Sequence, residues 1–318
     1  MLFAYRETAG RLERLAPDAV EGAVWIDLYR PQAPQVAAVR ALGVDVPTLA
    51  EMEEIELSAR LYREGGLDYM TIVIPGMSET KEATTGPLTF VIGPERLVTI
   101  RHHNPRPFET YPDRAPKVGP GCTDPDRVFL SLMEEITGRL ADLLEGAGRA
   151  LDAVAAQIFA EGTAARPEGM QATLRAVGQQ GEQVSRVRLA LLTIERAISY
   201  YGQQVAERPH GGALRPVVKG LMRDIQALEV HADFLSSRVA LATDATLGMI
   251  NLAQAQTIKI FSVLAVVFLP PTVIASAYGM NFAHMPELEW DWGYPMALGL
   301  MLASAVGTYL YFKWKRWL

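Results

Sequence analysis

The chain has 318 residues, of which 21% are charged, and it carries a formal net charge of -6 at pH 7. The acidic excess argues against nucleic acid as a partner and suits cations, although a moderately acidic surface is also what keeps many proteins soluble. The single cysteine, Cys122, excludes an intramolecular disulfide, and no nucleotide-binding loop, catalytic triad spacing or redox pair is visible, so we do not expect an enzyme.

Residues 1–121 are predicted to form a cytosolic α/β domain. Runs rich in β-branched and aromatic residues predict strands at 24–28, 69–74, 88–92 and 97–102, and short helices are expected at 34–42 and 47–55. Residues 105–121 contain five prolines and two glycines, a composition typical of a loop or linker. No apolar signal segment is visible at the start, so we expect this domain to stay in the cytoplasm.

Residues 122–212 are predicted to form a pair of cytosolic helices. Asp124 is an N-cap candidate, followed by Pro125 at the first helical position. Apolar residues then recur at steps of three and four as far as Ile158, and again over 184–205. Glycine-containing breaks separate these runs and end the second one at 209–212. The alternation is typical of an antiparallel helical pair or a coiled coil.

Residues 213–281 are predicted to form a long stalk that continues into a first transmembrane helix. From 217 onward only Gly248 and the Pro270-Pro271 pair interrupt the helical pattern, which predicts a helix of roughly 95 Å at 1.5 Å per residue. Residues 260–278 and 294–312 carry no charge, and each run is long enough to cross a bilayer core. The predicted fold class is therefore an α+β cytosolic domain with long helices, followed by an all-α membrane domain of two transmembrane helices.

Charges predict the orientation of the two spans. Lys259 precedes the first span, and three basic residues lie in the tail of the second segment, 294–318. The joining loop, 282–293, contains three acids and no lysine or arginine. The positive-inside rule therefore predicts that the loop lies outside the cell and that both termini lie in the cytoplasm. We expect the protein to be located in the cell inner (plasma) membrane.

The first span ends at the tripeptide Gly279, Met280, Asn281, which lies between Tyr278 and Phe282. A short amide at the mouth of a span is a natural place to select an ion. The alternative is structural, because Gly279 can end the helix and Asn281 can cap it.

The sequence of the C-terminal region resembles that of the CorA family of divalent-cation channels. Four elements agree in order and spacing: the segments 268–272 (FLPPT), 278–282 (YGMNF), 285–288 (MPEL) and 311–313 (YFK). The detailed resemblance covers about residues 244–318, whereas the N-terminal part agrees only in length and layout. Met280 favours the magnesium branch over a related zinc-transport branch, which often varies the middle residue of the tripeptide.

The resemblance implies a homopentamer with a funnel-shaped cytosolic domain, which cytosolic Mg²⁺ bound between subunits holds closed. Mg²⁺ is then both substrate and regulatory ligand. Asp244 matches an acidic regulatory position of the family. The chain departs from some relatives at Ala255, where they carry asparagine, and Asn251 one turn earlier is a candidate substitute.

Two spans cannot enclose a water-filled path, so a channel needs several subunits that share an axis. Helical steps backward from Asn281 define a stripe that is polar or small near the outside and apolar toward the cytoplasm: Ser276, Thr272, Leu269 (or Phe268), Ala265, Phe261 and Ile258. Small residues such as Ser276 and Ala265 equally suit helix packing, whereas the resemblance favours the pore for Thr272. The apolar part suits a constriction that gates by dewetting.

A ring of Asn281 amides is suited to hold a hydrated divalent ion by its waters, because Mg²⁺ sheds its water shell reluctantly. This logic does not separate Mg²⁺ from Co²⁺ or Ni²⁺. Glu287 in the external loop is expected to concentrate cations at the mouth, or else to be simply solvated. Two alternatives stay open: a zinc transporter of the same superfamily, and a membrane-anchored sensor or scaffold that transports nothing.

Overall fold

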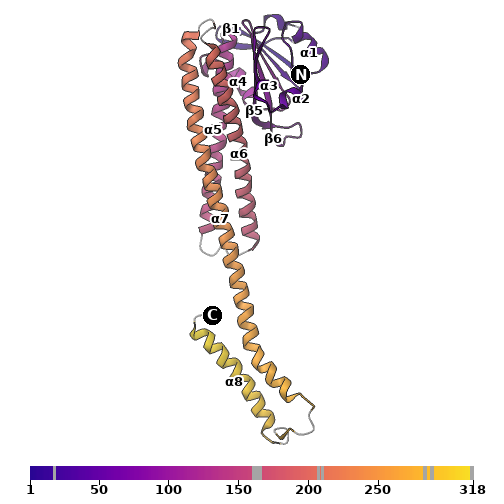
Figure 1. Ribbon diagram of the computed structural model, residues 1–318, viewed down its shortest axis with the longest axis vertical. Helices are drawn as coiled ribbons and strands as arrows, with labels where there is room; N and C mark the ends of the chain where they lie inside the picture. Colours follow the sequence, from indigo (N-terminus) through magenta and orange to yellow (C-terminus); the bar gives the residue numbers. More distant parts are fainter. Residues whose placement is uncertain are drawn as a thin grey trace. The chain divides into compact units, whose positions relative to one another are not determined.

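The structure, a computed structural model, describes residues 1–16, 19–159, 167–205, 208, 211–281, 285–286 and 290–315. It divides into two compact units: the first comprises Met1–Ala156 and Arg175–Ala242, and the second comprises Gln157–Leu174 and Thr243–Leu318. The predicted fold class is confirmed, because an α/β part with long helices is followed along the chain by two long apolar helices (Figure 1). The five-part domain division that we drew from the sequence stays a prediction.

The first unit is built on one mixed sheet of seven strands in the order β2-β1-β3-β7-β6-β5-β4. All neighbouring strands are antiparallel except β3 and β7, which run parallel with Trp25 opposite Leu97. The strands are β1 (Leu2–Thr8), β2 (Arg11–Arg14), β3 (Trp25–Tyr29), β4 (Leu61–Glu64), β5 (Leu67–Met77), β6 (Ala83–Ile92) and β7 (Leu97–Arg101).

Successive side chains of the central strands enter two different cores, as the period of two in a strand requires. In β6, Leu88 and Phe90 belong to the core shared with the long helices, while Val91 between Phe90 and Ile92 belongs to the opposite core. Val39 of α1 (Ala33–Arg40) and Met52 of α2 (Leu49–Glu53) are part of the opposite core. Helix α3 (Leu57–Arg60) follows α2 in the chain. Because both faces are covered, the strands read as nearly continuous apolar runs.

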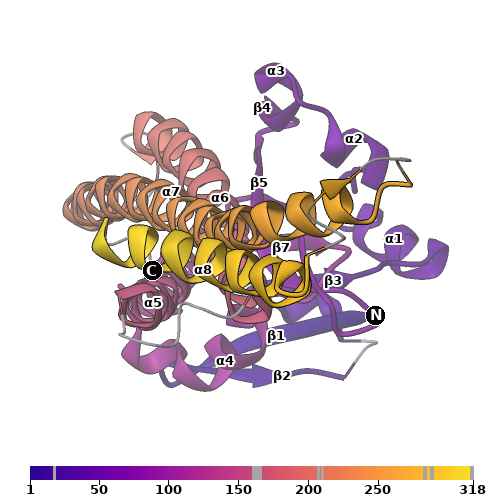
Figure 2. The same ribbon diagram turned by 90° about the horizontal axis from the view of Figure 1, so that it is seen from below.

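Three long helices form the other layer of the first unit: α5 (Pro125–Phe159), α6 (Pro167–Gln204) and the first part of α7 (Gly211–Tyr278). Figures 1 and 2 show them side by side against the sheet. The predicted start of α5 is confirmed, because the Asp124 carboxylate accepts a hydrogen bond of 2.9 Å from the Arg127 backbone amide. We expected Gly211 and Gly212 to belong to a break between helices, and they instead lie in the first turn of α7.

The expectation of a loop at 105–121 is wrong in part. Residues Pro107–Arg114 form helix α4, and Ala115–Lys117 form a short 3-10 helix. Pro107 suits the first helical position because proline there removes no intrahelical hydrogen bond. Phe108 and Tyr111 are buried in the main core, so packing outweighs the presence of Pro112 inside the helix. Strands β1, β2 and β4 were not predicted.

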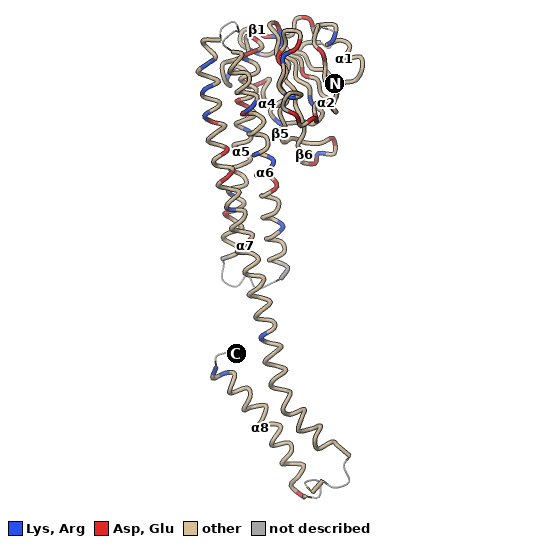
Figure 3. The backbone as a smooth tube through the Cα atoms, in the orientation of Figure 1, with Lys and Arg blue, Asp and Glu red and all other residues tan. Residues whose placement is uncertain are grey.

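Besides Gln157–Leu174, the second unit contains the last part of α7, from Thr243, and helix α8 (Gly293–Trp314). Both helices are long and apolar enough to cross a membrane, and only 6% of each apolar window is buried. Figure 3 shows no Lys, Arg, Asp or Glu along α7 beyond Lys259. An uncharged helix surface of this length in contact with water is unfavourable, so these helices fit a bilayer.

Candidate functional site

The candidate site begins where α7 ends. Tyr278 is the last helical residue, and the Gly279 amide donates to the Ala275 carbonyl at 2.9 Å. Gly279 does not adopt the left-handed conformation of a glycine C-cap, and a Cβ there would lie 3.1 Å from the Ala275 oxygen. Glycine fits here because it allows a close approach to the preceding turn, and the helix ends directly before it without a left-handed glycine, so both the structural and the ion-selecting interpretations stay open.

The next two residues of the tripeptide are exposed. Half of the Met280 surface is accessible (50%), and Asn281 is exposed as well. Among the described residues, no hydrogen bond joins the Asn281 side chain to a helix carbonyl. A free carboxamide at a helix end offers both an acceptor oxygen and donor hydrogens to water or to a hydrated ion.

The six positions of the predicted stripe are all exposed on one face of α7: Ile258, Phe261, Ala265, Leu269, Thr272 and Ser276. Ile258, Phe261 and Leu269 are each 66% accessible, which is high for large apolar side chains. Because an α-helix turns by about 100° per residue, these six positions lie within roughly a quarter of the circumference. The structure thus presents them together on one continuous surface.

The opposite face of α7 is the less exposed one. Val263 is 6% accessible, and Val267, Pro270 and Ile274, at helical steps of three and four, are only partly exposed. These positions lie about half a turn from the stripe. Figures 1 and 2 both show α8 running back alongside this part of α7. The stripe therefore lies within the wider face of α7 that a single copy of the chain leaves uncovered.

The polar residues of the stripe keep their oxygen lone pairs available. The Thr272 hydroxyl donates to the Phe268 carbonyl at 2.7 Å within the same helix, so its oxygen can still accept a hydrogen bond from water. Pro270 and Pro271 lack backbone donors, and α7 nevertheless continues through them to Tyr278.

Asp244 and Asn251 extend the same face toward the N-terminal part of α7. Asp244, Asn251 and Ile258 follow each other at steps of seven, which return to nearly the same side of a helix, and all three are exposed. Ala255, the departure from relatives, is exposed too. Sequence reasoning treated Asp244 apart from the stripe, and the seven-residue spacing is the signal that links them.

Among the described residues, no group of three or more His, Cys, Asp or Glu side chains could hold a metal ion. His103 is buried, and burial lowers its pKa to about 4, so at neutral pH it is an uncharged core residue bonded to the Ile74 carbonyl. Glu287 lies outside the described residues.

Comparisons with known proteins show relatives along the whole chain. A family model described as "CorA-like Mg2+ transporter protein" matches residues 20–316. The magnesium transport protein CorA of Pectobacterium atrosepticum is 34% identical over 323 residues, with 100% of both chains covered. The protein of the same name from Pasteurella multocida is 33% identical over 322 residues, again with 100% coverage of both.

Solved structures share the fold. The complete CorA magnesium transporter of Methanocaldococcus jannaschii aligns with a TM-score of 0.73 at 18% identity, covering 100% of this chain and 99% of that one. The cytoplasmic domain of ZntB from Vibrio parahaemolyticus aligns with a TM-score of 0.55 at 11% identity, covering 78% of this chain and 97% of that one. The full-length sequence match and the family model together show that this chain belongs to the CorA-like Mg²⁺ transporter family.

Proposed function

We propose that the protein is a divalent-cation channel that mediates uptake of Mg²⁺, and also of Co²⁺ and Ni²⁺, across the cell inner membrane. The observation that carries the proposal is the uncovered stripe of α7, which ends at the free amide of Asn281. One copy cannot enclose a path, so several α7 helices must surround a shared axis. In a homopentamer with both termini in the cytoplasm, the stripes of the five α7 helices would line a water-filled pore.

Selection is assigned to a ring of Asn281 side chains at the external mouth, with Gly279 and Met280 holding it in place. Neutral amides bind a hydrated ion through its waters without removing them, which suits the reluctance of Mg²⁺ to dehydrate. A carboxylate ring at the same place would hold the ion more tightly and release it more slowly. Glu287 would then raise the local concentration of cations near the mouth.

Closure is assigned to the apolar part of the stripe and to Asp244. A narrow neck lined by Leu269 and Phe261 loses its water when the helices approach, which stops conduction without a plug. Mg²⁺ bound between subunits near Asp244 would offset the repulsion of the facing carboxylates and favour the closed assembly. Loss of cytosolic Mg²⁺ would remove that bias and shift the population toward the open state.

Flux into liposomes that contain the purified protein tests the proposal. Uptake of Mg²⁺, Co²⁺, Ni²⁺ and Zn²⁺ would be followed with ion-sensitive dyes, with protein-free liposomes as control. The proposal predicts Mg²⁺ influx driven by the gradient alone. A clear preference for Zn²⁺ would instead indicate zinc transport, and the absence of any flux would indicate a membrane-anchored sensor or scaffold.

A further inference from the structure

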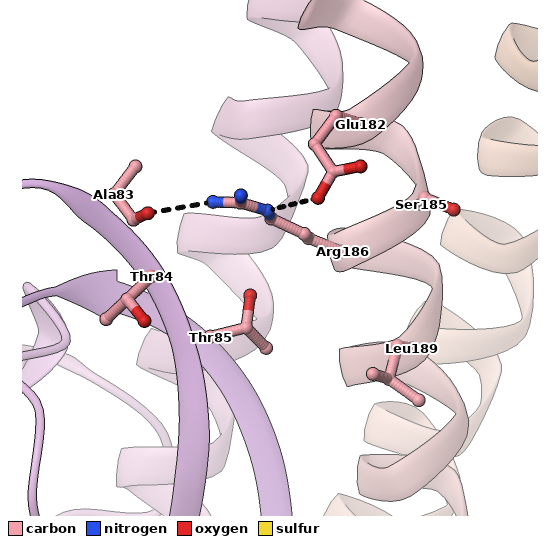
Figure 4. Close-up of a pocket in the computed structure, with 7 residues that line it drawn as sticks. All are labelled: Ala83, Thr84, Thr85, Glu182, Ser185, Arg186 and Leu189. Atoms are coloured by element: carbon pink, nitrogen blue, oxygen red, sulfur yellow. Dashed lines mark hydrogen bonds and ion pairs between the residues drawn. The ribbon is translucent and has the colours of Figure 1, made fainter.

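The first unit contains a large cavity that plays no part in the proposed conduction path. It has a volume of about 940 Å³ and lies among the end of the β5–β6 hairpin, the connection from β7 to α4, and helices α5 and α6. This volume is at the upper end of the range that small-molecule sites occupy in proteins, about 300–1,000 Å³. A smaller cavity of about 460 Å³, drawn in Figure 4, shares four lining residues with it: Ala83, Thr84, Glu182 and Arg186.

Four arginines and two glutamates line the cavity, and the two carboxylates are already engaged. Glu182 accepts a hydrogen bond of 2.9 Å from Arg186, which also donates to the Ala83 carbonyl at 3.0 Å, as Figure 4 shows. Glu109 accepts a hydrogen bond from the Asn104 side chain. Glu182 is thus paired with Arg186, whereas the neutral Asn104 amide leaves the charge of Glu109 in place, so one carboxylate faces the three remaining arginines and the lining keeps a net charge of +2.

Those three arginines are Arg106, Arg139 and Arg175. Within the described part of the chain, the carboxylate that pairs with Arg139 is that of Asp142, at the long distance of 3.9 Å, and neither Arg106 nor Arg175 forms an ion pair. They come from three different elements, the β7–α4 connection, α5 and α6, and meet around one cavity. Uncompensated guanidinium groups in a concavity attract anions, and their planar forks match the oxygens of phosphate groups.

The rest of the wall is not charged. Leu143 of α5, Val187 of α6 and Met77 of β5 supply apolar surface, and Gln183, which donates to the Leu143 carbonyl at 2.9 Å, keeps its side-chain oxygen as an acceptor. A bare phosphate ion would leave this apolar surface unused. The lining instead matches a ligand with an anionic end and a flat organic end that can form hydrogen bonds.

We propose that this cavity binds a nucleoside polyphosphate, with its phosphates against Arg106, Arg139 and Arg175 and its base against the apolar wall. The site belongs to the first unit alone and is independent of the conduction proposed for α7. It would give the cytosolic part of the protein a small-molecule ligand in addition to the transported cation.

Gly178 provides a way to narrow the cavity without replacing an arginine. It lies on α6 at the cavity wall, and a Cβ added there would meet no atom within 4 Å. Its backbone φ is not in the left-handed region, so a larger residue is compatible with the helix. Gly178→Leu should narrow the cavity at this wall, whereas Gly178→Ala should leave it nearly unchanged and serves as the matched control.

The experiment is a titration of the purified full-length protein with ATP by isothermal calorimetry, at fixed free Mg²⁺ and low ionic strength, with adenosine and inorganic triphosphate as comparison ligands. We expect ATP to bind more tightly than triphosphate, and adenosine not to bind measurably. Arg139→Ala and Arg175→Ala should each weaken ATP binding by about tenfold or more, since each removes a hydrogen bond between charged groups. Added salt should weaken it further.

The control for the arginine variants is Arg149→Ala, which removes the same charge from α5 at an exposed position paired with Glu145 at 2.6 Å, outside the cavity. It should bind ATP like the wild type, and Gly178→Leu should weaken ATP binding more than Gly178→Ala does. The proposal would be overturned by an absence of ATP binding, by equal binding of triphosphate, or by equal losses in Arg149→Ala and Arg175→Ala. Because these readouts measure binding alone, they are separate from any test of transport.

Discussion

Arg208 joins the sheet to the helical layer of the first unit, and its replacement by methionine should be strongly destabilising. Its guanidinium forms ion pairs with Asp68 of β5 and, at 2.7 Å, with Asp126 in the first turn of α5. The side chain of Arg208 is 13% accessible, and those of Asp68 and Asp126 are 2% and 12% accessible. Arg208→Met would therefore leave two carboxylates buried without their main cationic partner.

Breaking a buried ion pair by removing one partner typically costs about 3–5 kcal/mol. For a unit of this size, each kcal/mol lowers the melting temperature by about 2–4 °C, so we expect a decrease of about 6–20 °C. The assay is thermal unfolding of the purified full-length protein, followed by circular dichroism. Arg149→Met is the matched control, because the exposed Arg149–Glu145 pair should contribute less than about 1 kcal/mol.

Acidification should reduce the loss of stability that Arg208→Met causes. Burial raises the pKa of Asp126, while the Arg208 charge and the hydrogen bond from Tyr201 act in the opposite direction. A carboxyl whose pKa is raised on folding costs stability when it is ionised, and that cost disappears as the pH falls through the raised pKa. Removing Arg208 raises the pKa of Asp126 further. The loss of stability in Arg208→Met should therefore be largest at neutral pH and become smaller as the pH falls toward 3.8, the ordinary pKa of Asp.

A second substitution sharpens the test of this reasoning. Arg208→Met combined with Asp126→Asn should recover part of the lost stability, because the neutral amide no longer needs a buried cation. A melting temperature for Arg208→Met within about 2 °C of Arg149→Met, or a deficit that widens in acid, would refute the assignment of Arg208 as a buried link between sheet and helices.

Two further predictions concern conduction. Leu269→Asn should raise Mg²⁺ leakage at high cytosolic Mg²⁺, because a polar side chain stabilises water in a narrow neck; unchanged closed-state leakage in single-channel recordings would place the constriction elsewhere. Asp244→Ala should require a higher Mg²⁺ concentration to close, with ion selectivity unchanged, and superimposable inhibition curves of current against Mg²⁺ for the two proteins would remove Asp244 from regulation.

The long helices could be predicted from the sequence because their signals are local. Asp124 and the proline after it mark the start of α5, and apolar steps of three and four continue to its end. Helix α4 could not be predicted in this way, since its formation depends on burial of Phe108 and Tyr111 beneath residues distant in the chain. Strand β1 was missed for a similar reason, because its pairing with β3 supplies the order that its mixed composition does not indicate.

The candidate site divides along the same line. The tripeptide and the stripe follow from one helix and its period, so their positions could be worked out from the sequence and then placed on an exposed face. The arginine-lined cavity could not, because Arg106, Arg139 and Arg175 lie on three separate elements and meet only in the folded unit. No spacing rule connects residues brought together by tertiary packing.

A ring of Asn281 amides at the end of the α7 stripe is proposed to select the ion. The most direct test is Mg²⁺ flux into liposomes that contain Asn281→Ala, beside the wild type at equal protein density, with size-exclusion chromatography to confirm that the oligomer is intact. Loss of Mg²⁺ flux from an intact oligomer is the predicted result. Wild-type flux through Asn281→Ala would contradict the account and reduce Asn281 to the end of a helix.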